Sequence, residues 1–186
     1  MLKRWLLVAL LSTVPLTVLA LVTPSRVLET FKDVSCVGSV ICTDDMSRYN
    51  DALELYNGAL RFLSVSLTPL QKKPLIVFCA TEACYHSFGF SGSKGQSVGS
   101  FCIVISPRGW NPYIVRHEMI HQLQHQELGL LKLYREPTWF IEGMAYSLSE
   151  DPRPELPPPY QQFRNQFQAW HALKGHNDLW SDASLP

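Results

Sequence analysis

Two histidines and a glutamate stand together in the run His117-Glu118-Met119-Ile120-His121. Histidines four residues apart lie on the same face of a helix, so both imidazoles can bind one metal ion. The glutamate that follows the first histidine projects beside that ion, where it can take a proton from water. The spacing therefore predicts a hydrolytic metal site, provided that the segment is helical and that a third ligand lies within reach.

The residues around this motif are typical of a helix over 111–128. Asn111 and Pro112 suit the N-cap and the first helical position, and Gly129 suits a left-handed cap at the end. Opposite the histidines runs an apolar stripe that can pack on a core, formed by Val115, Met119, Ile120 and Leu123. The alternative is an ordinary amphipathic helix with two surface histidines.

His125, on the same helix, is one candidate for the third ligand. It follows His117 by eight residues, which corresponds to about 12 Å along the axis. Ligands of one zinc ion lie only a few ångströms apart. We therefore expect His125 to be exposed rather than a ligand.

Glu142 is the better candidate, on a second helix expected from Pro137-Thr138 to Leu148. The small residues Gly143 and Ala145 would let the two helices approach closely. The alternative is a solvated helix carboxylate, but the apolar neighbours of Glu142 argue against it. The two helices together predict His117, His121 and Glu142 as a metal-binding set.

These two segments also resemble a known family. V-R-H-E-M-I-H-Q-L at 115–123 and P-T-W-F-I-E-G-M-A-Y at 137–146 look like the H-E-x-x-H and W-x-x-E-G-x-A patterns of the gluzincin (peptidase MA-like) zinc metallopeptidases. The resemblance covers about 35 residues. The chain lacks the N-E-x-x-x-D pattern of the thermolysin and aminopeptidase groups and the longer metzincin motif.

The resemblance implies a zincin-like fold and hydrolysis of peptide bonds in a peptide or protein substrate. It implies Zn²⁺ as the cofactor, held by His117, His121 and Glu142, with Glu118 as general base. It also implies that the strand before the metal helix, at 101–105, is a sheet edge to which an extended peptide binds. For the donor that stabilises the oxyanion we expect Tyr146, with Tyr113, His171 and His176 as rivals.

The rest of the chain predicts an α+β fold, with a small mixed sheet packed on helices. An irregular lead-in is expected over 23–45 and a helix over 46–65. Apolar runs at 74–79 and 100–105 predict strands, separated by a loop or hairpin crossing at 87–99 that is rich in glycine and serine. Prolines predict an extended connector over 151–159, and Phe163, Phe167 and Trp170 form the core face of a last helix over 160–174.

The composition of the chain limits the classes of function that it can have. Sixteen basic and sixteen acidic side chains cancel among 186 residues, which argues against nucleic acid as a partner. Residues 1–22 combine Lys3 and Arg4 with an apolar run, as in a signal peptide, and membrane attachment through residues 5–22 is the alternative. Either reading predicts an exported protein, periplasmic or extracellular, with a single domain over 23–186.

Five cysteines fit an exported protein, in which disulfides persist. Cys36 and Cys42 are expected to close a short loop. Among Cys79, Cys84 and Cys102, a 79–102 bridge between strands and a local 79–84 bridge both remain open.

Two other classes of protein compete with the metallopeptidase. One is a non-catalytic exported module that keeps a degenerate peptidase fold and uses its metal for folding or binding. The other is a scaffold that binds a partner through residues 87–99 and the proline connector.

Overall fold

The computed structural model describes residues 33–38, 40–174 and 179–180. The predicted leader at 1–22 and the rival donor His176 lie outside these residues. Within the described part of the chain, no helix is both long enough and apolar enough to cross a membrane.

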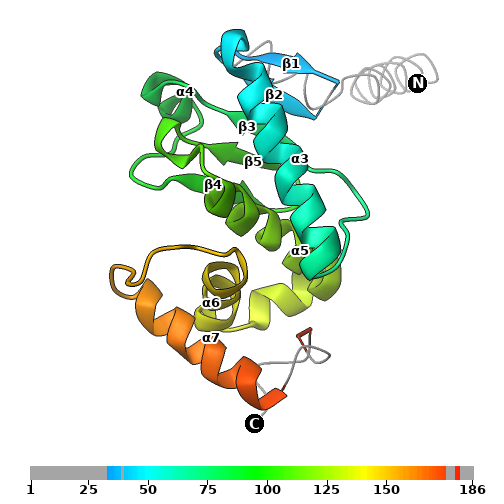
Figure 1. The fold of residues 1–186 in the computed structure, drawn as a ribbon, viewed down its shortest axis with the longest axis vertical. Helices are drawn as coiled ribbons and strands as arrows, with labels where there is room; N and C mark the ends of the chain where they lie inside the picture. Colours follow the sequence, from blue (N-terminus) through cyan, green and yellow to red (C-terminus); the bar gives the residue numbers. More distant parts are fainter. Residues whose placement is uncertain (1–32, 39, 175–178, 181–186) are drawn as a thin grey trace, which may run out of the picture.

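A five-stranded mixed sheet forms the upper part of the molecule, with strand order β1-β2-β3-β5-β4 (Figure 1). The three central strands β2, β3 and β5 are parallel, and both edge strands are antiparallel to their neighbours. The predicted α+β class with a small mixed sheet is therefore confirmed. The bounds are β1 Ser35–Val37, β2 Ile41–Thr43, β3 Leu75–Phe78, β4 Gly95–Val98 and β5 Cys102–Ile105.

Alternate residues of the central strands face two separate apolar clusters. Ile76 and Phe78 of β3 point to the larger cluster, which includes buried side chains of the long helices. Val77 points to a smaller cluster on the opposite face, together with Cys84 and Tyr85 of the short helix α4. Because both faces are covered, these strands are apolar runs without polar alternation.

The predicted helices are present. Their bounds, with two 3₁₀ turns, are η1 Met46–Arg48, α3 Tyr49–Ser66, α4 Glu82–Ser87, η2 Pro107–Gly109, α5 Pro112–Arg135, α6 Thr138–Leu148 and α7 Tyr160–Lys174. Phe167 of α7 is fully buried and Trp170 packs against the same cluster, as their spacing predicts.

The metal helix α5 departs from its predicted ends in two ways. Gly129 has the expected positive φ, 69°, but helical structure resumes after it and continues to Arg135. The prediction of a helix end at Gly129 is therefore wrong in part, because Leu133 beyond it packs on the main core. Asn111 precedes the first turn, yet its side-chain amide donates to the Arg108 carbonyl (3.5 Å) instead of accepting from the helix.

Four elements were not predicted as a helix or strand. Strands β1 and β2 fall in the expected lead-in, β4 lies in the glycine- and serine-rich segment, and α4 follows β3, where no element was assigned. The strands have three or four residues each, which is too short for a clear alternation of polar and apolar side chains.

The position of β4 corrects the expectation that 101–105 is the sheet edge. β5 is bonded on one side to β3 and on the other to β4, with Ser97 opposite Ile103. β4 therefore occupies the edge that the resemblance assigned to the strand before the metal helix.

The disulfides are Cys36–Cys42 and Cys79–Cys84, and Cys102 is free. The first pairs directly opposite residues of β1 and β2. Because Cys102 is opposite Leu75, Cys79 lies about 13 Å further along the sheet, too far for a bridge. The two disulfides are typical of an oxidising, exported location.

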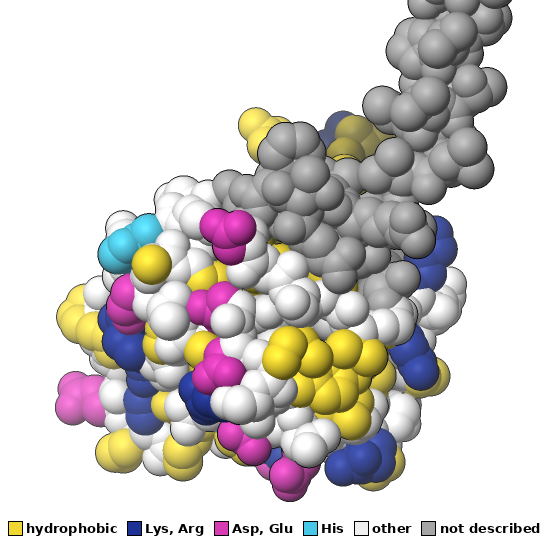
Figure 2. Space-filling model, turned by 90° about the horizontal axis from the view of Figure 1, so that it is seen from above, with side chains coloured by type: hydrophobic (Ala, Val, Ile, Leu, Met, Phe, Trp, Pro, Cys, Tyr) yellow, Lys and Arg dark blue, Asp and Glu magenta, His cyan; other side chains and the backbone are white. Residues whose placement is uncertain are grey.

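Acidic and basic side chains are interspersed on the face shown in Figure 2, and neither sign forms a continuous patch there. This distribution agrees with the zero formal net charge of the chain.

We expect the purified protein, denatured without reductant, to react with one equivalent of a thiol reagent. Peptide mapping should place the label on Cys102, since the other four cysteines are paired. A label on Cys79 or Cys84 would contradict the local bridge.

Candidate metal centre

His117, His121 and Glu142 converge as the two helices predict. The Nε2 atoms of the two histidines are 3.2 Å apart, and each lies 3.6–3.7 Å from a carboxylate oxygen of Glu142. One donor atom from each residue lies within 4.8 Å of the others, so the group could hold a metal ion. Two imidazoles and a carboxylate are ligands that zinc accepts.

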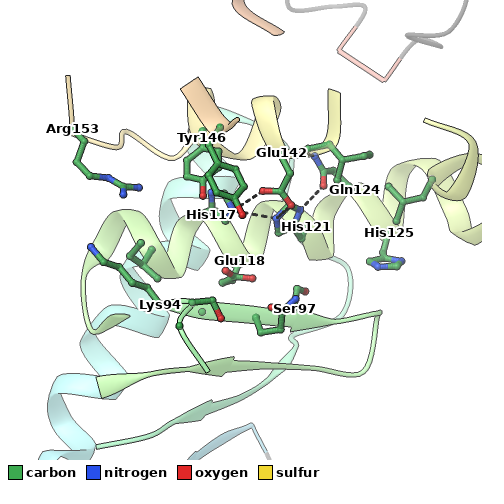
Figure 3. A pocket seen from close by; sticks show the side chains of 18 of the residues that line it. Lys94, Ser97, His117, Glu118, His121, Gln124, His125, Glu142, Tyr146 and Arg153 are labelled. Carbon is green, nitrogen blue, oxygen red and sulfur yellow. Dashed lines mark hydrogen bonds and ion pairs between the residues drawn. The ribbon is translucent and has the colours of Figure 1, made fainter. Parts of the chain in front are cut away.

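The packing of α5 against α6 brings these residues together (Figure 3). Val115, Met119, Ile120 and Leu123 of α5 are fully buried in the main core, opposite the two histidines. The expected role of Gly143 is wrong, because it faces α7: an added Cβ would lie 2.3 Å from the Phe163 carbonyl oxygen. Gly143 therefore lets α6 approach α7 rather than α5.

Gln124 is a site residue that the sequence analysis missed. Its side-chain amide donates to the Ile141 carbonyl (2.9 Å), which leaves its Oε1 to accept from His121 Nδ1 (2.8 Å). With the proton on Nδ1, the Nε2 lone pair of His121 faces Glu142. The fully buried Gln124 thus sets the His121 tautomer and ties α5 to the residue before Glu142, as outer partners of metal ligands do. Its position three residues after His121, on the same helical face, is the only sequence signal for it.

Glu118 lies between α5 and the edge strand β4. The Ser97 backbone N–H donates to its carboxylate, and burial raises the pKa of Glu118 to about 7. An added Cβ on Gly95 would lie 2.8 Å from Glu118 Cγ and Oε1, so this approach requires glycine. Gln122 donates to the Gly99 carbonyl (2.7 Å) and to the Ser97 hydroxyl, which joins the metal helix to the far end of β4.

The pKa of the nearby Glu142 shifts in the opposite direction. Burial opposes its ionisation, but the hydrogen bond from His117 and the charges of the two imidazoles outweigh burial, so the pKa of Glu142 lies below its usual value. The site therefore contains one carboxyl that favours ionisation and one that can exchange a proton near neutral pH.

Tyr146 also lies at the site, with its ring centroid 4.4 Å from that of His117. Burial is the main cause that raises its pKa, and Glu142 adds to it. The hydroxyl therefore keeps its proton at neutral pH and can donate a hydrogen bond.

The described rivals of Tyr146 as oxyanion donor lie outside the cleft lining. Tyr113 is outside the cleft lining, and its hydroxyl accepts from Lys94 Nζ at 3.4 Å. His171 stacks on the buried Phe167 on the far helix α7. Among the described rivals, neither borders the cleft.

The three candidate ligands line one cleft with a volume of about 710 Å³, together with Glu118, Gln124 and Tyr146. It lies between the segment 91–97 on one side and α6 with Arg153 and Tyr160 on the other (Figure 3). His125 lines it and is half-buried, so the expectation that His125 is exposed is wrong. Burial and the neighbouring His121 lower the pKa of His125.

We expect Gln124→Leu to weaken zinc binding roughly 10–100-fold, because His121 loses the partner that orients it. The dissociation constant is measured by competition with a chromophoric chelator. The matched control is Gln126→Leu on the same helix, since Gln126 bonds to the loop at 69–71 and not to the site. Equal zinc affinity in the Gln124 variant and the wild type would contradict this role.

A second prediction concerns stability without metal. Because burial raises the pKa of Glu118 to about 7, protonated Glu118 is favoured by the folded state. Its contribution to the free energy of unfolding is present below about pH 4.5 and is lost as the pH rises through 7. Glu118→Gln should therefore raise the free energy of unfolding by up to about 3 kcal/mol at pH 8 and by much less at pH 5. Urea titrations in excess chelator measure it, and an equal change at both pH values would refute it.

The chain matches no protein-family model, no curated protein and no solved structure at a significant level.

Proposed function

We propose that the protein is an exported zinc metallopeptidase of the gluzincin type that hydrolyses peptide bonds. The convergence of His117, His121 and Glu142 within 4.8 Å, beside a buried glutamate in an open cleft, carries the proposal. Zinc held by these residues supplies Lewis-acid activation of water and of a carbonyl group.

Glu118 is the general base of the proposed mechanism. Burial raises its pKa to about 7, close to the pH at which a group both takes and returns a proton efficiently. It takes a proton from the attacking water and delivers it to the leaving amine. The Ser97 N–H and the contact with Gly95 hold the carboxylate in place during both transfers.

Tyr146 is the proposed donor to the oxygen that becomes negative when water adds to the carbonyl. A donor aimed at developing charge contributes about 3–4 kcal/mol in comparable sites. The raised pKa of Tyr146 supports this role, since an ionised phenol could not donate.

The substrate is proposed to bind as an additional strand along β4. β4 is an edge strand and pairs with β5 on one side only. Gly95, Gln96 and Ser97 line the cleft, so an extended peptide paired with this edge would pass the metal ligands. Backbone hydrogen bonds would supply affinity with little dependence on sequence.

The number of ligands favours catalysis over a structural metal. Structural zinc sites have four protein ligands, whereas catalytic sites have three and an open position. The group found among the described residues has three members. The second cluster, Asp44 with Cys79 and Cys84, involves a disulfide and therefore offers no thiolate.

Digestion of a peptide library tests the proposal. The zinc-loaded protein should cleave peptides, lose activity in chelator and regain it with zinc. Glu118→Gln should lower kcat at least about a hundredfold while one zinc per chain remains bound.

The matched control is Glu127→Gln, on the same helix but outside the cleft lining, which should retain activity. Cleavage that persists in chelator, or in the Glu118→Gln variant, would disprove the proposed mechanism.

A further inference from the structure

Two basic side chains, Lys94 and Arg153, border the same end of the cleft. They come from opposite walls: Lys94 directly precedes β4, and Arg153 belongs to the connector between α6 and α7. In Figure 3 both lie on one side of the metal ligands, and His125 lies on the other.

Both cations lie near the ring of Tyr113. The Lys94 ammonium lies 5.9 Å and the Arg153 guanidinium carbon 5.5 Å from the centre of the Tyr113 ring. The guanidinium is also 5.9 Å from the ring centre of Tyr146, the proposed oxyanion donor.

Both residues are held in place before any ligand binds. The Lys94 carbonyl accepts from the Ser106 N–H and hydroxyl, each at 2.9 Å. The Arg153 carbonyl accepts from Arg164 Nη1 (3.0 Å). These bonds anchor the backbone at both positions, which lowers the conformational entropy lost when a ligand binds.

The charges at this end are not balanced. Arg153 Nε and Nη2 bond to Asp151, whose side chain is 1% exposed, while the Arg153 side chain remains 30% exposed. Among the described residues, Lys94 forms no ion pair, and its bonded partner is the neutral Tyr113 hydroxyl. Lys94 therefore brings a positive charge that no acidic side chain among the described residues pairs with.

The other acidic groups of the cleft do not neutralise this charge. The acidic residues that line it are Glu118 and Glu142, and their two negative charges would balance a bound Zn²⁺. On the other side of the metal ligands lie Gln124 and His125 (Figure 3). The lysine and the arginine that line the cleft therefore both lie at one end of it.

We propose that Lys94 and Arg153 form a subsite for a carboxylate of the peptide substrate. This inference rests on the proposed peptidase function and names the substrate class: peptides with an acidic side chain, or a free C-terminus, on one side of the cleaved bond. Lysine and arginine donors bind carboxylates through charge-assisted hydrogen bonds, and the half-buried position limits screening by water.

Peptide binding to the zinc-loaded Glu118→Gln variant tests the subsite, because this variant binds peptides without cleaving them. One series of peptides carries Asp or Asn at each position in turn, and a second pair ends in a free acid or an amide. We expect one series to show about tenfold tighter binding of the acid, by calorimetry, and that series identifies the source of the carboxylate.

The preference must depend on Lys94. With Lys94→Met added, the ratio of acid to neutral affinity should fall to near one, and with Lys94→Arg it should be largely kept. Lys72→Met removes the same charge from an exposed loop outside the cleft lining and should leave the ratio unchanged. In the active protein, the ratio of kcat/KM between the acidic and the neutral peptide of each pair should match the ratio of their affinities.

The outcomes separate the two proposals. Equal affinity for acid and neutral peptides in both series would overturn the subsite even if peptides are cleaved. A preference that survives Lys94→Met would also overturn it, because the carboxylate would then be bound without Lys94. A Lys94-dependent preference without cleavage would support the subsite and disprove the peptidase function.

Discussion

The candidate metal centre depends on one constraint, the fixed approach of α6 to the histidine face of α5. The two histidines need only their own helix to face the same way, but the carboxylate comes from a different helix. Gln124 spans the gap: it accepts from His121 Nδ1 and donates to Ile141, the residue before Glu142. A single buried amide therefore sets both the tautomer of one ligand and the position of the helix that carries another. Behind it, the apolar face of α5 fills the main core and prevents rotation of the histidines away from Glu142.

The edge strand imposes the second constraint. Glu118 is buried against β4, where the Ser97 N–H donates to its carboxylate and Gly95 makes room for it. Burial raises the pKa of Glu118, and the same strand borders the cleft. One four-residue strand thus positions the proposed base and forms the sheet edge along which we propose that a peptide binds. Gln122 anchors the far end of this strand to the metal helix, so hydrogen bonds connect the two sides of the site.

Much of this architecture could be predicted from the sequence, and the predictions that were wrong share a cause. The long helices and the strands β3 and β5 have strong periodicity or length, and α7 begins and ends where the aromatic spacing and the prolines indicate. The strands β1, β2 and β4 are short and have no hydrophobic pattern of their own. They are strands because they pair with neighbouring strands. The same cause explains the misplaced sheet edge: β5 looks like an edge strand until the segment after α4 is seen to fold beside it. Gly143 was assigned to the wrong helix pair because a small residue shows that something approaches closely but not which element does.

The sequence by itself determined the candidate metal-binding residues, since helical periodicity places His117 and His121 on one face and the second helix supplies a glutamate. It also determined the apolar strands and the oxidising compartment, through local pattern and cysteine content. Only the tertiary structure decided which residues support that set, because Gln124, Gly95 and Ser97 act through contacts with segments distant in the chain. Tertiary structure likewise decided that Cys79 pairs with Cys84, since the register of β3 with β5 separates Cys79 from Cys102. It also placed Lys94 and Arg153 at one end of the cleft, because no local periodicity relates residues that come from opposite walls.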